Sequence, residues 1–180
     1  MSIPDPGNRR APGEGADIPA IGDPAHVVDA ALTCRWESRC QSPYSLVHGD
    51  YRLDNLMFPP DGSGVCAVDW QTIIIGLPAR DLAYFLATAL PPSLRRAEEV
   101  PIVSAYHGRL VELGVRGYSA RECFADYRRG MLHGPLITVL GCMYATALRS
   151  ADSDRMFLSM ARGCCAAIRD LGSLDLVENS

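Results

Sequence analysis

Apolar and polar positions divide the chain into a polar beginning, a short segment of strands and loops, and a long helical segment. Residues 1–24 hold five of the 13 prolines and four of the 16 glycines, with almost no large apolar side chains. This composition is typical of disordered segments. The pattern therefore predicts a disordered tail over residues 1–24 and a folded domain over residues 25–175.

The first predicted helix directly follows the tail. Asp23 is a favourable N-cap residue and Pro24 suits the first helical position. Apolar residues then recur at helical spacing as far as about Arg39, at Val28, Ala31, Leu32 and Trp36. The spacing predicts a short amphipathic helix.

Short apolar runs predict strands in the next segment. Two of them, Ser45–His48 and Leu56–Phe58, precede a turn sequence rich in proline and glycine at residues 59–64. The turn leads into a third run, Val65–Val68. We expect these runs to form short strands around a loop, including a β-hairpin.

Helical periodicity dominates from Arg80 to about Leu171. The first helix carries an apolar face and ends at Pro91 and Pro92. Ser93 and Pro101 are each predicted to open a further helix, and a break is expected near Gly134–Pro135. The predicted fold class is α+β, mainly α, with a small strand-and-loop unit followed by a helical bundle.

Ser119 and Glu122 have the spacing of a capping box, which satisfies free backbone donors where a helix begins. Trp70 and Tyr84 are predicted to lie in the core. His107 and His133 are expected to be surface or hydrogen-bonded core residues, and Cys164 and Cys165 to be packing residues.

Composition narrows the classes of function. The chain of 180 residues has a net charge of −4, and its 17 basic residues are all arginine. Scattered arginines in an acidic chain argue against nucleic-acid binding, and the lack of lysine excludes Schiff-base and Walker A chemistry. The apolar stretch from Gly130 to Leu148 is interrupted by histidine, proline and glycine, so we expect no membrane span.

The seven cysteines indicate a reducing compartment. They are odd in number, show no C-x-x-C spacing and follow no segment resembling a secretory leader. We therefore expect reduced thiols and a cytoplasmic protein.

One polar constellation stands out among the predicted strands. Asp50 and Asn55 lie five residues apart on a predicted loop, and Asp69 ends a predicted apolar strand. Their oxygen atoms suit a hard cation such as Mg²⁺, and a further carboxylate beside the metal can orient or deprotonate a hydroxyl group. Each residue taken singly more often marks a turn or helix cap, because Asp and Asn favour loops for local hydrogen bonding.

At these residues the sequence resembles the aminoglycoside phosphotransferase and choline kinase branch of the protein-kinase-like fold. Three motifs occur in the family's order: His48-Gly49-Asp50 with Asn55, then Asp69 after a hairpin, then the segment from Gly76 to Ala83. The resemblance implies transfer of a phosphoryl group from ATP or GTP, with Mg²⁺, to a hydroxyl of a small molecule.

The resemblance also assigns roles. It makes Asp50 the base, Asn55 and Asp69 the metal and nucleotide ligands, and Asp81 a brace that hydrogen-bonds backbone amides of the catalytic loop. His48 would pack beneath the metal-binding strand. Arg52 completes the candidate catalytic set as a residue that either touches a phosphate or serves as a structural partner.

The resemblance covers roughly residues 25–175 and corresponds to the C-terminal lobe of such a kinase, with the N-terminal lobe absent. In the family the missing lobe covers the nucleotide and supplies a lysine, whereas only 47 residues precede His48 here. Leu77 also departs from the family pattern, which often has aspartate there. Activity would then require a completing N-lobe subunit or a longer natural form.

Two alternatives to a phosphotransferase remain open. The chain would be a truncated, inactive kinase-like remnant that binds a ligand or forms homo-oligomers through newly exposed apolar surface. It would otherwise be a metal-dependent phosphohydrolase that uses the same acidic groups on water.

Overall fold

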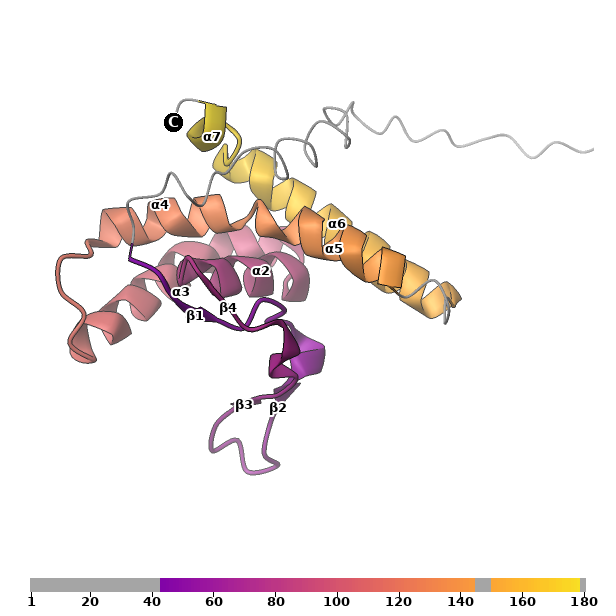
Figure 1. The fold of residues 1–180 in the computed structure, drawn as a ribbon, viewed down its shortest axis with the longest axis horizontal. Helices are drawn as coiled ribbons and strands as arrows, with labels where there is room; N and C mark the ends of the chain where they lie inside the picture. The colour runs from indigo at the N-terminus through magenta and orange to yellow at the C-terminus, as the bar shows by residue number, and fades with distance from the viewer. Residues whose placement is uncertain (1–42, 145–149, 179–180) are drawn as a thin grey trace, which may run out of the picture.

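The computed structural model describes residues 43–144 and 150–178 (Figure 1). The predicted tail and the predicted helix ending near Arg39 lie outside these residues. Within them, a strand-and-loop unit, residues 43–78, packs at one side of a helical bundle, residues 79–144 and 150–178. The predicted mainly helical class is confirmed.

Two separate pairs of antiparallel strands form the strand-and-loop unit. β1 (Ser45–Val47) pairs with β4 (Ile74–Gly76), and β2 (Leu56–Met57) pairs with β3 (Cys66–Ala67) as the predicted hairpin. In Figure 1 this hairpin projects away from the helices. The sequence analysis missed β4, because its apolar run does not alternate as a half-buried strand would.

The bundle contains five long helices and a short final one within the described residues. These are α2 (Ala79–Ala89), α3 (Pro92–Glu112), α4 (Ala120–Gly130), α5 (His133–Tyr144), α6 (Ala151–Leu171) and α7 (Asp175–Glu178). The capping box at the start of α4 is confirmed, with Ser119 and Glu122 bonding each other's backbone amides. In the described part of the chain, no helix has the length and apolar character required to cross a membrane.

Two predicted helix boundaries are wrong. Pro101 lies inside α3 and does not begin a new helix, since the buried Arg95, Glu99 and Val103 hold both of its halves against the bundle. The expected break at Gly134–Pro135 falls earlier, at residues 131–132, and both residues belong to the first turn of α5. A proline costs no hydrogen bond in the first turn of a helix.

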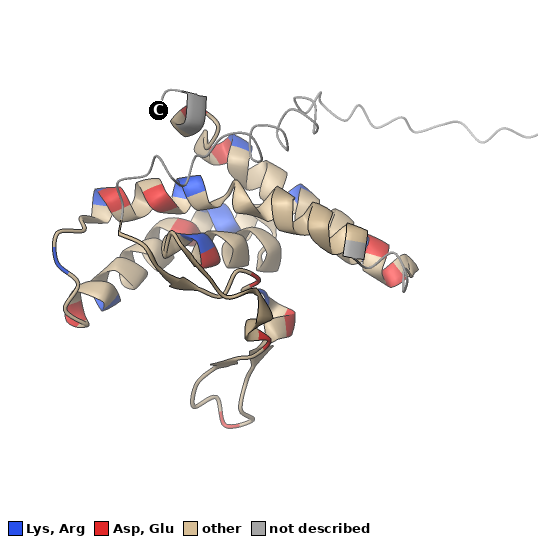
Figure 2. Cartoon of the chain, in the orientation of Figure 1, with Lys and Arg blue, Asp and Glu red and all other residues tan. Residues whose placement is uncertain are grey.

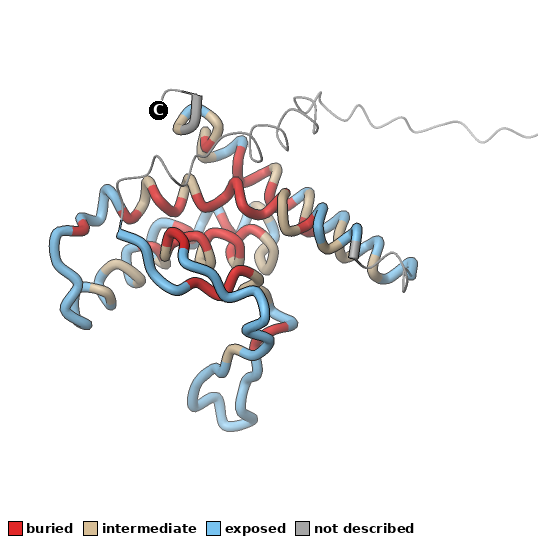
Figure 3. The backbone as a smooth tube through the Cα atoms, viewed as in Figure 1, coloured by how far each residue is buried: buried red, intermediate tan, exposed pale blue. Residues whose placement is uncertain are grey.

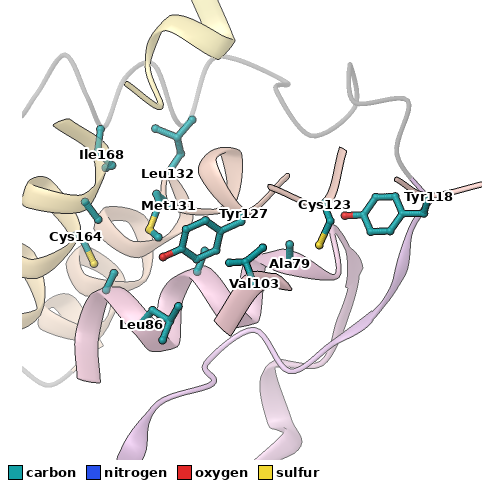
Figure 4. Packing of buried hydrophobic residues seen from close by; sticks show 13 residues of the cluster. Ala79, Leu86, Val103, Tyr118, Cys123, Tyr127, Met131, Leu132, Cys164 and Ile168 are labelled. Atoms are coloured by element: carbon teal, nitrogen blue, oxygen red, sulfur yellow. The ribbon is translucent and has the colours of Figure 1, made fainter. Parts of the chain in front are cut away.

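The hydrophobic core lies between the helices (Figure 4). Helix α2 occupies its centre and contacts α3, α4, α5 and α6. The contact with α6 is close because Gly163 has no side chain: a Cβ there would lie 2.1 Å from the carbonyl oxygen of Ala87. Figure 3 shows buried residues concentrated in these helices, whereas most of the hairpin is exposed.

A buried ionic cluster ties three helices together. The Arg95 guanidinium bonds Glu99 of its own helix and Asp170 of α6. The Tyr127 hydroxyl of α4 donates to the same Glu99 carboxylate at 3.1 Å. The charges are paired and hydrogen-bonded, which burial of charged groups requires.

Candidate active site

The loop after β1 depends on a glycine. Gly49 has a φ of +84°, and a Cβ there would lie 2.4 Å from the carbonyl oxygen of Thr72. Only glycine accommodates both the left-handed backbone and this close approach. The Thr72 hydroxyl also donates to the His48 carbonyl at 2.8 Å. The loop is thereby joined to the segment that follows Asp69.

His48 links the loop to the end of the hairpin. Its Nε2 lies 2.8 Å from the Val68 carbonyl oxygen, and its Nδ1 lies 3.3 Å from the amide nitrogen of Asp50. Because the amide must donate to Nδ1, Nε2 is the ring nitrogen that donates to the Val68 carbonyl. The buried imidazole also packs against Trp70, with ring centroids 4.7 Å apart.

Two helices hold the backbone of the loop. The Asp81 carboxylate of α2 accepts hydrogen bonds from the amides of His48, at 2.6 Å, and Gly49, at 3.0 Å. From α5, Nε2 of His133 donates to the Gly49 carbonyl at 2.9 Å. Since burial lowers the pKa of His133 to about 4, this ring is neutral at physiological pH.

Three donors surround the Asp50 carboxylate. The Asn55 amide donates to Oδ2 at 3.1 Å and to the Asp50 backbone carbonyl at 2.8 Å. Arg52 Nε approaches Oδ2 at 3.3 Å, and the Tyr84 hydroxyl donates to Oδ1 at 3.1 Å. The Asp50 side chain nevertheless keeps 23% of its surface exposed. It is therefore fixed in place and still accessible to a small molecule.

The Arg52 guanidinium contacts three side chains. Besides Asp50, its guanidinium bonds the exposed Asp54 carboxylate at 2.9 Å and lies 3.4 Å from the sulfur of Met156 on α6. In this arrangement the arginine is a structural partner of the loop and also faces the bundle.

The hairpin brings the two predicted metal ligands to the same end. Pairing of Leu56 with Ala67 continues into a hydrogen bond from the Val68 amide to the Asn55 carbonyl, 2.9 Å long. Asp69 follows immediately, with a φ of +64°. Among the described residues it is the one non-glycine residue with positive φ. Aspartate tolerates this conformation better than most residues, and such strain is common at functional sites.

The oxygen atoms at this end of the hairpin fit Mg²⁺. Because the Asn55 amide nitrogen faces Asp50, its carbonyl oxygen remains available to a cation. The exposed Asp69 carboxylate bonds Gln71 at 3.5 Å and, within the described part of the chain, neither Asn55 nor Asp50. The described residues contain no cluster of three or more His, Cys, Asp or Glu side chains. Mg²⁺ typically takes one or two protein ligands and completes its shell with water and phosphate oxygens.

The charge of this region also favours a cation. Residues 43–78 contain four aspartates and a single arginine, Arg52. Figure 2 shows the acidic positions along the hairpin and the adjoining loop. A polyphosphate would be repelled there unless a divalent ion accompanied it.

A pocket of about 230 Å³ lies between the loop, the end of α2 and α6. Arg52 lines it and connects it to Asp50. Four of the other lining residues are apolar, two carry a hydroxyl group and one is acidic. They are Leu53, Ala89, Met156 and Met160, then Thr88 and Ser159, and Asp54.

Sequence reasoning missed the roles of three aromatic or histidine residues. Tyr84 is buried as predicted, but its hydroxyl reaches Asp50. Of the two roles expected for His133, surface or hydrogen-bonded core, the structure shows the second, and its partner in the loop was not predicted. Trp70 was predicted to be core and is 49% exposed. The spacing of Tyr84, three residues after Asp81 on one helix, is the signal that would have indicated a shared face.

Comparison with known proteins identifies a kinase-like family. The sequence model of the Ecdysteroid kinase-like family matches residues 19–116, more than half of the chain. This segment includes the loop, the hairpin and α2. No solved structure matches the chain significantly.

The curated relatives are much longer proteins. The chain is 51% identical over 55 residues to Acyl-CoA dehydrogenase family member 10 of Mus musculus, covering 29% of this chain and 5% of that protein. It is 52% identical over 42 residues to Acyl-CoA dehydrogenase family member 11 of Homo sapiens, covering 23% and 5%. For the Mus musculus member 11 the identity is 40% over 62 residues, covering 31% and 8%. In each case the alignment spans less than a tenth of the relative.

Proposed function

This chain belongs to the Ecdysteroid kinase-like family, and from that premise we propose that it transfers a phosphoryl group from ATP or GTP to a hydroxyl of a small molecule. The observation that carries the proposal is the arrangement around Asp50. Its accessible carboxylate is held beside Asn55 at 3.1 Å, and the hairpin joins Asn55 to the segment that bears Asp69.

In the proposed reaction, Asp50 acts as the base. The acceptor oxygen forms a bond to the γ-phosphorus while the bond from that phosphorus to the β,γ-bridging oxygen breaks. The hydroxyl proton passes to the Asp50 carboxylate, and the nucleoside diphosphate leaves with the electron pair. Alignment and charge neutralisation are the main contributions required of the protein.

Asn55 and Asp69 are the residues proposed to hold Mg²⁺. The ion would neutralise phosphate charge in a part of the chain where the described residues offer four aspartates and one arginine. Asn55 would bind the metal through its side-chain carbonyl oxygen while its amide nitrogen donates to the Asp50 carboxylate.

The pocket beside Arg52 is proposed to bind the acceptor. Its volume of about 230 Å³ suits a compact molecule, and the two methionines favour an apolar carbon skeleton. Its lining carries one aspartate and one arginine. This charge balance does not provide the acidic surface that a polycationic aminoglycoside would require.

Calorimetry with Mg-ATP tests the nucleotide half of the proposal. We expect wild-type protein to bind Mg-ATP and Asp69→Ala to lose at least about tenfold in affinity, because a metal-bridging carboxylate is removed. Asp61→Ala is the matched control, since Asp61 is an exposed carboxylate in the hairpin turn. Equal binding by all three proteins would contradict the metal assignment.

A phosphate-transfer assay tests the chemistry. Asp50→Asn should lower transfer from Mg-ATP to a panel of small alcohols at least about a hundredfold, the loss expected for a general base, while Mg-ATP binding persists. Phosphate release that depends on Asp50 but not on any alcohol would instead favour the hydrolase.

A second candidate function is self-association without catalysis. Exposed apolar side chains favour it: Leu46 and Ile75 lie opposite each other in the β1–β4 pair, and each is 68% exposed. Sedimentation analysis distinguishes the two candidates, since a concentration-dependent dimer that binds no Mg-ATP would support the association module.

A further inference from the structure

One turn of α2 presents two side chains to the loop that carries Asp50. Asp81 and Tyr84 are three residues apart and therefore lie on the same face of the helix. Asp81 bonds two backbone amides of the loop, and the Tyr84 hydroxyl bonds the Asp50 side chain. A single rigid element thus contacts both the backbone of the loop and its candidate base.

The Tyr84 hydroxyl is suited to be a permanent donor. The residue is fully buried, and a buried tyrosine hydroxyl requires a partner. Burial and the neighbouring Asp50 charge raise the pKa of Tyr84 far above its ordinary value, so the proton stays on the hydroxyl. Its bond to a carboxylate is charge-assisted and stronger than a neutral hydrogen bond.

Tyr84 differs from the other two side-chain donors to Asp50. Asn55 and Arg52 both approach Oδ2 and belong to the same loop segment as Asp50. Tyr84 approaches Oδ1 from the bundle. Of these three donors, it alone is itself a residue of a bundle helix.

We propose that Tyr84 is a positioning residue that sets the orientation of the Asp50 carboxylate toward the acceptor hydroxyl. The inference rests on the proposed phosphotransferase function. Tyr84 touches neither nucleotide nor acceptor in this scheme and acts through Asp50. Its removal should therefore lower the rate of the chemical step and leave nucleotide binding unchanged.

A double-mutant cycle tests the proposal. Steady-state transfer of phosphate from Mg-ATP to the panel of small alcohols is measured for wild type, Tyr84→Phe, Asp50→Asn and the double variant. We expect Tyr84→Phe to lower kcat about tenfold or more, the loss expected for a hydrogen bond to a charged group. The KM for Mg-ATP should change less than about twofold, and the double variant should match Asp50→Asn.

Tyr127→Phe is the matched control. Tyr127 is also fully buried, and its hydroxyl also donates to a carboxylate at 3.1 Å, but that carboxylate is Glu99 in the bundle. Its kcat should equal the wild-type value. A similar loss of kcat in Tyr127→Phe, or an undiminished effect of Tyr84→Phe in the Asp50→Asn background, would show a merely structural role and overturn the proposal.

A spectroscopic measurement separates this inference from the proposed function. If wild-type protein transfers no phosphate to any alcohol of the panel, the phosphotransferase proposal fails, and the ¹³C resonance of the Asp50 carboxyl at pH 7 then decides on Tyr84. A shift in Tyr84→Phe that Tyr127→Phe lacks supports the positioning contact. An unchanged Asp50 resonance overturns it.

Discussion

The helical bundle and the strand-and-loop unit meet opposite physical requirements. In the bundle, large side chains such as Leu86 and Tyr127 are fully buried, and even Arg95 is 1% exposed. In the strand-and-loop unit, exposed apolar side chains occur along every strand, including Leu46, Met57 and Ile75. The unit carries Asp50, Asn55 and Asp69, whereas the bundle supplies Asp81, Tyr84 and His133, which hold the loop. The bundle therefore imposes the geometry of chemical groups that lie in the less buried region.

The largest expected effect comes from removing the arginine of the buried ionic cluster in the bundle. Arg95→Met leaves the Glu99 carboxylate buried without its cation. The free energy of unfolding should fall by about 3–5 kcal/mol, measured by urea denaturation at pH 7. Arg96→Met is the matched control: Arg96 bonds the same Asp170 at 2.8 Å but is 52% exposed. We expect a loss below about 1 kcal/mol there, and equal losses would refute the distinction.

The second effect concerns pH and the contact between the bundle and the loop. The pKa of His133 is about 4 in the folded protein against 6.5 for an ordinary histidine, chiefly because the ring is buried and then because Arg80 is near. As the pH falls from 6.5 to 4, the unfolded chain gains a proton that the folded protein does not. The stability that depends on a neutral His133 is therefore fully present above pH 6.5. The free energy of unfolding should decline by about 3 kcal/mol as the pH falls from 6.5 to 4.

Denaturation at several pH values checks this dependence. His133→Gln retains a donor for the Gly49 carbonyl but has no titrating group, so its stability should vary less across this window. An identical pH profile in both proteins would show that other groups cause the loss.

A third, smaller effect compares two glycines of the strand-and-loop unit. Both Gly49 and Gly62 have positive φ, but a Cβ at Gly62 meets nothing within 4 Å, whereas one at Gly49 meets Thr72. Gly62→Ala should cost about 1 kcal/mol of backbone strain, and Gly49→Ala about 2 kcal/mol or more because a clash adds to it. Urea denaturation gives both values, and Mg-ATP binding should weaken only in Gly49→Ala. Indistinguishable variants would contradict the close approach.

The smallest expected effect is at the exposed strands. Ile75→Thr should change the free energy of unfolding by less than about 0.5 kcal/mol, because Ile75 is 68% exposed. Ile168→Thr is the matched substitution in the core, where the residue is 5% exposed, and should cost about 2 kcal/mol or more. If Ile75→Thr proved as costly as Ile168→Thr, the β1–β4 surface would be covered in solution.

Local patterns predicted the elements well where the signal lay within a few residues. The helix after Arg80, the hairpin around residues 59–64 and the capping box at Ser119 all agree with the structure. Pro101 and β4 were misjudged because their outcome depends on packing from distant parts of the chain. A proline within a helix or a continuous apolar run is ambiguous until its neighbours are known.

Sequence patterns alone predicted the mainly helical class, the hairpin and the candidate set of Asp50, Asn55, Asp69 and Asp81. These depend on residue type and spacing along the chain. Only the tertiary structure decided that Tyr84 and His133 reach the loop and that Trp70 is exposed. The physical reason is that a buried polar group needs a hydrogen-bond partner, and that partner is provided by whichever element packs against it.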